Sequence, residues 1–116
     1  MTRRNERTSE LIKQEISRLL EREVNDPRLI GLISVTEVSL SPDLKHAKIF
    51  VSALQNENRE EVLEGFNTAS GFLRHELALH LKLRHVPKLS FHYDDSIERG
   101  TRLLKLIGEL DDTRQA

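Results

Sequence analysis

The feature that most constrains this fold is the strict alternation of apolar and polar side chains over residues 47–53. The apolar positions are Ala47, Ile49, Val51 and Ala53. Because successive side chains of a β-strand point to opposite faces, a period of two predicts a strand with one face in a core and one in solvent. Half-buried strands of this kind are typical of antiparallel sheets that are packed on one side.

Two further runs complete the predicted sheet. Residues 33–40 also alternate, but the parity slips by one residue at Glu37, which predicts a β-bulge there. Ser41-Pro42-Asp43 is typical of a turn, so residues 33–40 and 46–53 are predicted to pair as an antiparallel hairpin. Apolar and polar residues alternate again over residues 89–94, which predicts a third strand.

The segments outside these runs have helical periodicity. Over residues 6–24, Ile12, Ile16 and Leu19 recur at steps of four and three, which predicts an amphipathic helix. Near the end of the chain, Asp95-x-x-Glu98 resembles a capping box, which predicts that a last helix begins there.

Residues 57–85 fit two templates, because the leucines from Leu77 to Leu83 alternate as a strand would. Composition favours helix, since no β-branched residue occurs between Thr68 and Val86 and good helix formers predominate. Gly71 interrupts the helical pattern and lowers helix stability by about 1 kcal/mol relative to Ala. We therefore expect two helices that meet at a kink near Gly71.

The predicted order is α-β-β-α-α-β-α in one α+β domain, with a three-stranded sheet and helices on one face. A chain of 116 residues fits a single domain, with an ordered core over residues 5–110 and short tails. The absence of cysteine excludes disulfides, thiol catalysis and Cys-ligated zinc. We see no signal peptide and no membrane-spanning apolar run, so we expect a cytoplasmic protein without membrane contact.

Two groups of residues resemble catalytic or metal motifs, and we reject both. His75 and His80 are five residues apart, whereas helical zinc ligands need a separation of four to share one face. Ser90, His92 and Asp94 share a strand face, but residues two apart on a strand lie roughly 6.5 Å apart, which is too far for a catalytic triad. We expect no catalytic residue, no metal site and no cofactor.

Charge is segregated along the chain, although the net charge is only −1. Residues 72–92 contain four Lys and Arg against one carboxylate, whereas residues 57–64 and 94–112 each carry three excess negative charges. The four cationic residues are Arg74, Lys82, Arg84 and Lys88. A basic face on a nearly neutral protein favours oriented docking on a polyanion. A solvated surface of mixed charge is the alternative that this pattern leaves open.

Short motifs also follow one another in a distinctive order along the chain. They are Asp26-Pro27-Arg28, Val38-Ser39-Leu40-Ser41-Pro42-Asp43-Leu44, Ala47 to Val51, Ala69-Ser70-Gly71-Phe72-Leu73-Arg74, Leu83-Arg84-His85-Val86-Pro87-Lys88-Leu89-Ser90-Phe91, and Asp94-Asp95-Ser96 with Gly100. In this order and spacing, from the first predicted helix to the last, the sequence resembles the ribosome-binding factor A family, bacterial factors for assembly of the small ribosomal subunit.

The resemblance implies a KH-like fold related to type II, in agreement with the predicted order of elements. Ordinary KH domains hold a nucleotide backbone with a Gly-x-x-Gly loop. Here Ala69-Ser70-Gly71 stands in its place, which implies recognition of folded 16S rRNA by shape and phosphate contacts. The resemblance further implies a non-enzymatic monomer that binds free 30S subunits, assists late 16S rRNA maturation and matters most in the cold.

The expected RNA-binding surface lies within residues 69–92. In this surface Gly71 would allow a close turn between helices, and the four cationic residues named above would contact phosphate. Arg3, Arg4 and Arg7 are possible additional contacts, with a disordered N-terminal arm as the alternative. The rival function is a protein-interaction domain without RNA binding, and a small-molecule enzyme is a third.

Overall fold

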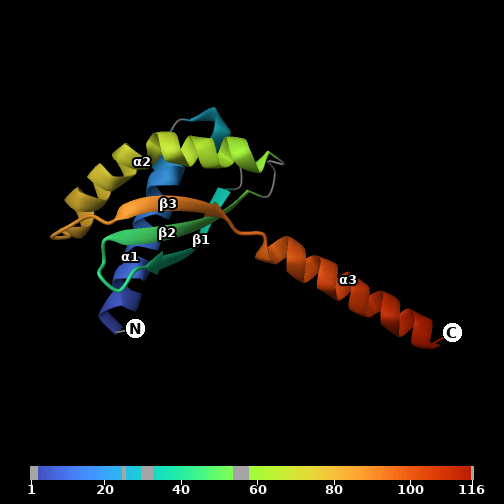
Figure 1. Cartoon of the computed structure of the whole chain (residues 1–116). Helices are drawn as coiled ribbons and strands as arrows, with labels where there is room; N and C mark the ends of the chain where they lie inside the picture. Colours follow the sequence, from blue (N-terminus) through green and yellow to red (C-terminus); the bar gives the residue numbers. More distant parts are fainter. Residues whose placement is uncertain (1–2, 25, 30–32, 54–57, 116) are drawn as a thin grey trace.

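The computed structural model describes residues 3–24, 26–29, 33–53 and 58–115, and its elements follow one another as shown in Figure 1. They are α1 (Arg3–Arg22), the short 3-10 helix η1 (Pro27–Leu29), β1 (Ile33–Leu40), β2 (His46–Ala53), α2 (Arg59–Leu81), β3 (Lys88–Tyr93) and α3 (Ser96–Gln115). The three predicted strands are confirmed, with β3 beginning and ending one residue earlier than expected.

The sheet has the strand order β1-β2-β3. β1 and β2 form the predicted antiparallel hairpin, and the register shifts between Val35 and Glu37, which confirms the predicted bulge. β2 and β3 are parallel, with His46 opposite Lys88 and Val51 opposite Tyr93. Parallel neighbours need a crossover connection, and α2 supplies it.

The core lies on one face of the sheet, under α1 and α2. The helical stripe predicted from Ile12, Ile16 and Leu19 is fully buried there. It meets the inward-facing residues of β2, which are also buried. Phe66 of α2 stacks on Phe91 of β3, with ring centroids 5.0 Å apart. The α+β class and the three-stranded sheet predicted from the sequence are therefore confirmed.

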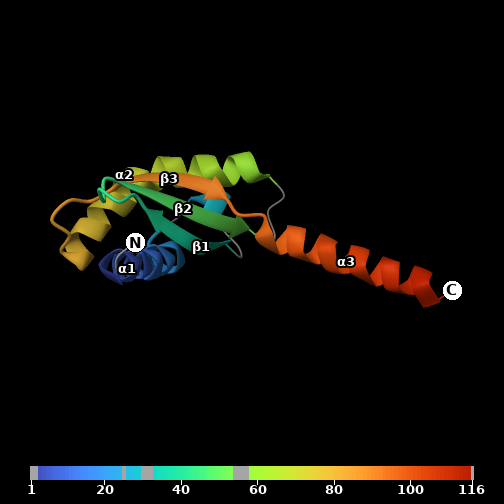
Figure 2. The same cartoon turned by 60° about the horizontal axis from the view of Figure 1, so that its bottom comes forward.

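The expectation of two helices between residues 57 and 85 is wrong, because α2 is one continuous helix. Its axis bends between its green-yellow first half and its gold second half (Figures 1 and 2). Gly71 lies within the helix, where Leu73 and Leu77 on the following turns are fully buried. Burial of those two leucines outweighs a glycine penalty of about 1 kcal/mol, so the helix continues through Gly71.

The last helix begins where the sequence predicts, but it does not cover the sheet. α3 projects away from the body of the domain (Figures 1 and 2), so the expectation that all helices pack on one face is wrong for α3. Leu104 is 71% exposed and Leu103 is 59% exposed. α1 and α2 already occupy the apolar face of the sheet, so α3 finds no core to join. Parts of the predicted capping box and of the two acidic stretches lie outside the described residues. These are residue 57 and the side chains of residues 97, 98 and 110–112.

A close approach between η1 and α2 closes one end of the core. A Cβ atom added at Gly65 would lie 3.0 Å from Leu29 Cγ and 3.2 Å from Arg28 Cβ. The Arg28 guanidinium donates to Asp26 at 2.7 Å and, with the Arg28 backbone N–H, lowers the pKa of Asp26 to about 2. The Asp-Pro-Arg motif therefore fixes the short helix against which Gly65 packs.

Candidate nucleic-acid interface

A groove of about 910 Å³ lies at the end of the sheet where β1 ends and β3 begins. One wall is the β1–β2 turn, and the other is the connection between α2 and β3. Its lining residues are Thr8, Leu40, Asp43, Leu44, Lys45, Arg74, Lys82, Leu83, Arg84, His85, Val86, Pro87 and Lys88. We call it the basic groove.

Local hydrogen bonds shape the β1–β2 turn. The Asp43 carboxylate accepts from the Ser41 hydroxyl at 2.6 Å and from the Lys45 backbone N–H at 3.0 Å. Leu44 adopts a left-handed conformation with φ of 60°, which is uncommon for a residue other than glycine. The Lys88 N–H donates to the Lys45 carbonyl at 2.9 Å, so the turn is tied directly to the start of β3.

The opposite wall starts where α2 ends. Lys82 adopts a left-handed conformation with φ of 51° and caps the helix, which turns the chain toward β3. The Arg74 guanidinium donates to the Val86 carbonyl at 3.3 Å and links the helix to the connection. Val86 packs against the core and Pro87 is buried, so the connection is anchored from below while its charged residues face solvent.

The charge of this groove is strongly positive. Five Lys and Arg residues line it against one carboxylate, that of Asp43. All five are exposed: Lys45, Arg74, Lys82, Arg84 and Lys88. Hydrogen bonds from Ser41 and from the Lys45 N–H lower the pKa of Asp43, so this carboxylate stays ionised at neutral pH. A groove of this kind attracts a phosphate backbone.

The structure brings together the four cationic residues predicted from the sequence, since each of them lines the basic groove. The predicted segment from Ala69 to Gly71 does not line it. Ala69 packs against the core, Ser70 is half-buried and Gly71 is exposed. A Cβ atom at Gly71 would meet nothing within 4 Å, so the close helix-helix turn expected there is absent.

The N-terminal arginines are helical rather than part of a disordered arm. Arg3, Arg4 and Arg7 all belong to the first turns of α1, and Arg7 is exposed. Thr8, the next residue, lines the basic groove. The side chains of Arg3 and Arg4 lie outside the described residues.

Lys45 is the cationic residue of the groove that our sequence reasoning missed. It follows a recognisable turn, but nothing local connects it to the basic stretch that begins at Arg74. The parallel pairing of β2 with β3 places Lys45, which precedes β2, beside Lys88 at the start of β3. A parallel pairing is a long-range property, and the periodicity of either strand does not encode it.

The two rejected motifs are also visible in the structure. Ser90 Oγ and His92 Nε2 lie 3.0 Å apart, so the distance argument against this pair is wrong, because the His92 imidazole is long enough to reach the serine two residues away. Asp94 bonds to Thr36 and Ser96.

In the other rejected motif, the pair His75 and His80, His80 Nδ1 lies 2.7 Å from the Glu15 carboxylate on α1. Among the described residues, no group of three or more His, Cys, Asp or Glu could hold a metal ion. None of the helices that the structure describes contains an apolar stretch that could span a bilayer.

Comparison with known proteins gives one consistent result. The family model for ribosome-binding factor A matches residues 4–107. Ribosome-binding factor A of Coxiella burnetii is 52% identical over 107 residues, which cover 92% of this chain and 89% of the relative. The Acetivibrio thermocellus protein of the same name is 47% identical over 107 residues and covers 91% and 87%, respectively.

Solved structures agree with this match and confirm the predicted KH-like fold. The crystal structure of ribosome-binding factor A from Thermus thermophilus superimposes with a TM-score of 0.70 at 27% identity, covering 77% of this chain and 93% of that one. A homology model of the Thermus thermophilus factor, fitted into a cryo-EM map of a 30S complex, gives a TM-score of 0.56 at 28% identity. The match covers 73% of this chain and 93% of that one.

Proposed function

The chain belongs to the ribosome-binding factor A family, and on that premise we propose that it is a non-enzymatic factor for assembly of the small ribosomal subunit. It binds free 30S subunits or their precursors as a monomer in the cytoplasm. There it assists late maturation of 16S rRNA, with its largest effect in the cold. The relative fitted into the 30S complex supports this partner.

The observation that carries the proposal is the basic groove. Lys45, on one wall, and four cationic residues from α2, its connection and the start of β3 surround one space. Residues from separate segments converge on a single anion-attracting surface, although the whole chain is nearly neutral. This arrangement suits the contact of one polyanion from several sides.

The mode of recognition that we propose is phosphate and shape contact with folded rRNA. The lining of the groove contains Lys, Arg and His but no Phe, Tyr or Trp on which a base could stack. Lys82 and Arg84 extend from an irregular connection that caps a helix, and their long side chains can reach a backbone without reading bases.

Co-sedimentation with purified 30S particles tests the proposal. The variant carries Glu at all four predicted cationic positions: Arg74, Lys82, Arg84 and Lys88. We expect its association to be lost while its melting temperature falls only slightly. Exposed charges contribute little to stability, and the bond from Arg74 to the Val86 carbonyl contributes about 1 kcal/mol, whereas each phosphate contact releases counterions.

The matched control carries the same charge change on other exposed residues: Arg22, Lys48, Arg102 and Lys105. If the groove variant and the control co-sediment equally well, the basic groove is not the interface. The rival function, a protein-interaction domain without RNA binding, predicts association that is insensitive to salt. We expect a steep loss of association as salt rises.

A further inference from the structure

A second groove runs along the open edge of the sheet. Within the described residues β1 pairs with β2 on one side and with no strand on the other. β1 is eight residues long, so it presents a row of backbone N–H and C=O groups to its unpaired side. Such an edge is a template for the addition of an extended segment as another strand.

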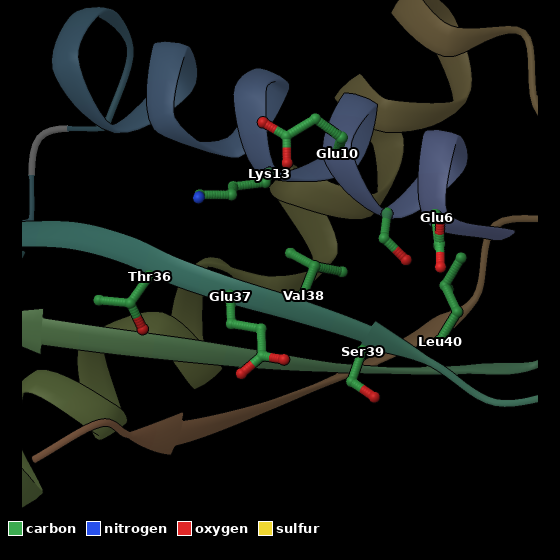
Figure 3. A pocket seen from close by; sticks show the side chains of 9 residues that line it. Glu6, Glu10, Lys13, Thr36, Glu37, Val38, Ser39 and Leu40 are labelled. Carbon is green, nitrogen blue, oxygen red and sulfur yellow. The ribbon is translucent and has the colours of Figure 1, made fainter. Parts of the chain in front are cut away.

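This groove has a volume of about 300 Å³ and lies between α1 and β1 (Figure 3). Its lining residues are Glu6, Ser9, Glu10, Lys13, Thr36, Glu37, Val38, Ser39 and Leu40. From Glu37 to Leu40 the pairing with β2 is regular, because the bulge lies before Glu37. A regular edge offers evenly repeating hydrogen-bond sites, which strand addition requires.

Carboxylates stand on both faces of this edge. Figure 3 shows Val38 and Leu40 pointing toward α1, whereas Glu37 points away from it. Glu6 and Glu10 lie one helical turn apart on α1, on the other side of the edge. Because side chains of an added strand alternate between the faces, basic residues at successive positions of that strand would all meet carboxylates.

We propose that this groove, which we call the acidic groove, binds an extended Lys/Arg-rich segment of a partner protein as a fourth strand on β1. Three carboxylates against Lys13 give it an excess of negative charge. In the part of the chain that the structure describes, no ion pair involves Glu6, Glu10 or Glu37, so these carboxylates are available to a ligand.

Charge also decides between possible occupants. A nucleic-acid backbone would be repelled by the three carboxylates. A second copy of this chain, paired through β1, would bring an identical set of carboxylates against the first, and like charges opposed across a strand pair are destabilising. A basic extended polypeptide satisfies both the open backbone edge and the charge. The proposal is independent of RNA binding by the basic groove.

The probe for this inference is a labelled lysine-rich peptide with interspersed threonines, titrated into the full chain. Fluorescence anisotropy measures affinity, and NMR amide shifts locate the site. We expect shifts centred on residues 36–40. We expect Glu6→Lys with Glu10→Lys to weaken binding by at least about tenfold, because reversed charges repel the peptide. The matched control is Glu21→Lys with Glu60→Lys, two exposed glutamates outside the groove, which should leave binding nearly unchanged.

A second peptide separates strand addition from plain charge attraction. It keeps the same lysines but is N-methylated at alternate amides, so that it cannot donate to a strand edge. Loss of binding by this peptide supports the proposal. Equal binding of both peptides, shifts away from β1, absence of binding, or a dimer in light scattering would each overturn it.

Discussion

The basic and acidic grooves adjoin at Leu40, which lines both, yet they have opposite charge and are built in different ways. The basic groove is formed mainly by a turn and a connection, residues 41–45 and 82–87, that hydrogen bonds hold in place. The acidic groove is formed by a helix and a strand. A net charge near zero therefore conceals two neighbouring surfaces that suit opposite partners.

The difference also concerns how each surface is supported. Side chains of the acidic groove project from α1 and β1, whose buried sides form part of the core. The basic groove depends on two residues in left-handed conformations, Leu44 and Lys82, and on the bond from Lys88 to Lys45. Both grooves share one core, so a core defect should damage both, whereas a surface change should damage one.

The largest effect on stability is expected from Gly65→Val. Because both grooves rest on the same core, this substitution should destabilise both grooves together. The added side chain would collide with Leu29 and Arg28, whose atoms lie 3.0–3.2 Å from the position that a Cβ atom would take. Overpacking of this kind costs about 1–3 kcal/mol. Thermal or denaturant unfolding measures the loss. A variant with wild-type stability would show that η1 moves aside freely.

A pair of charge reversals should sharpen the comparison. Lys45→Glu lies in the basic groove and should lower affinity for 30S particles about tenfold, with a salt dependence reduced by about one phosphate contact. Lys13→Glu makes the same change in the acidic groove and should leave 30S affinity unchanged. Co-sedimentation across a salt series measures both. Equal losses for the two variants would mean that the grooves act as one surface.

The pH dependence of stability should depend in part on the Asp94 carboxylate, which bonds to Thr36 in the lining of the acidic groove. Asp94 accepts from the Thr36 hydroxyl and from the Ser96 N–H, and these bonds lower its pKa. Because the folded pKa lies below the unfolded value, near 3.9, this stabilisation is present above about pH 4 and is lost as the pH falls through the folded value.

Asp94→Asn should therefore lower stability by on the order of 1 kcal/mol at neutral pH and flatten the decline below about pH 4. Urea unfolding at a series of pH values gives both results. A decline as steep as that of the wild type would assign the acid sensitivity to other carboxylates, such as Asp26.

The smallest effect is expected from Ser70→Ala. Ser70 is half-buried in α2 and does not line either groove. Alanine is the better helix former, so stability should change by no more than about 0.5 kcal/mol. Binding to 30S particles should be unchanged. A clear fall in 30S affinity at constant melting temperature would extend the RNA interface along α2 to residues 69–71.

Sequence periodicity predicted the regular elements of this fold well, for a physical reason. A buried stripe or a buried alternation is required by the burial itself, so the core residues of α1 and β2 follow directly from the pattern. The bulge at Glu37 could be predicted from the sequence for the same reason, because a paired strand accommodates a slip in alternation by a bulge.

What the sequence did not reveal depends on contacts between distant segments. Gly65 resembles any other glycine in a helical pattern until η1 is placed against it. Lys45 joins the basic groove through a parallel strand pairing that no local pattern records. The continuity of α2 through Gly71 and the departure of α3 both depend on which apolar surfaces other elements have already covered.

The separation of α3 from the body has a consequence for the timing of its fluctuations. A helix of 20 residues whose described side chains are all exposed is marginal in water, because packing of an apolar face supplies most helical stability in proteins. Its backbone amides can therefore open without disturbing the sheet, as a cooperative unit of their own. Deuterium should enter the backbone amides of α3 long before it enters those of β2. One chain would then show two exchange regimes, fast in α3 and slow in the sheet.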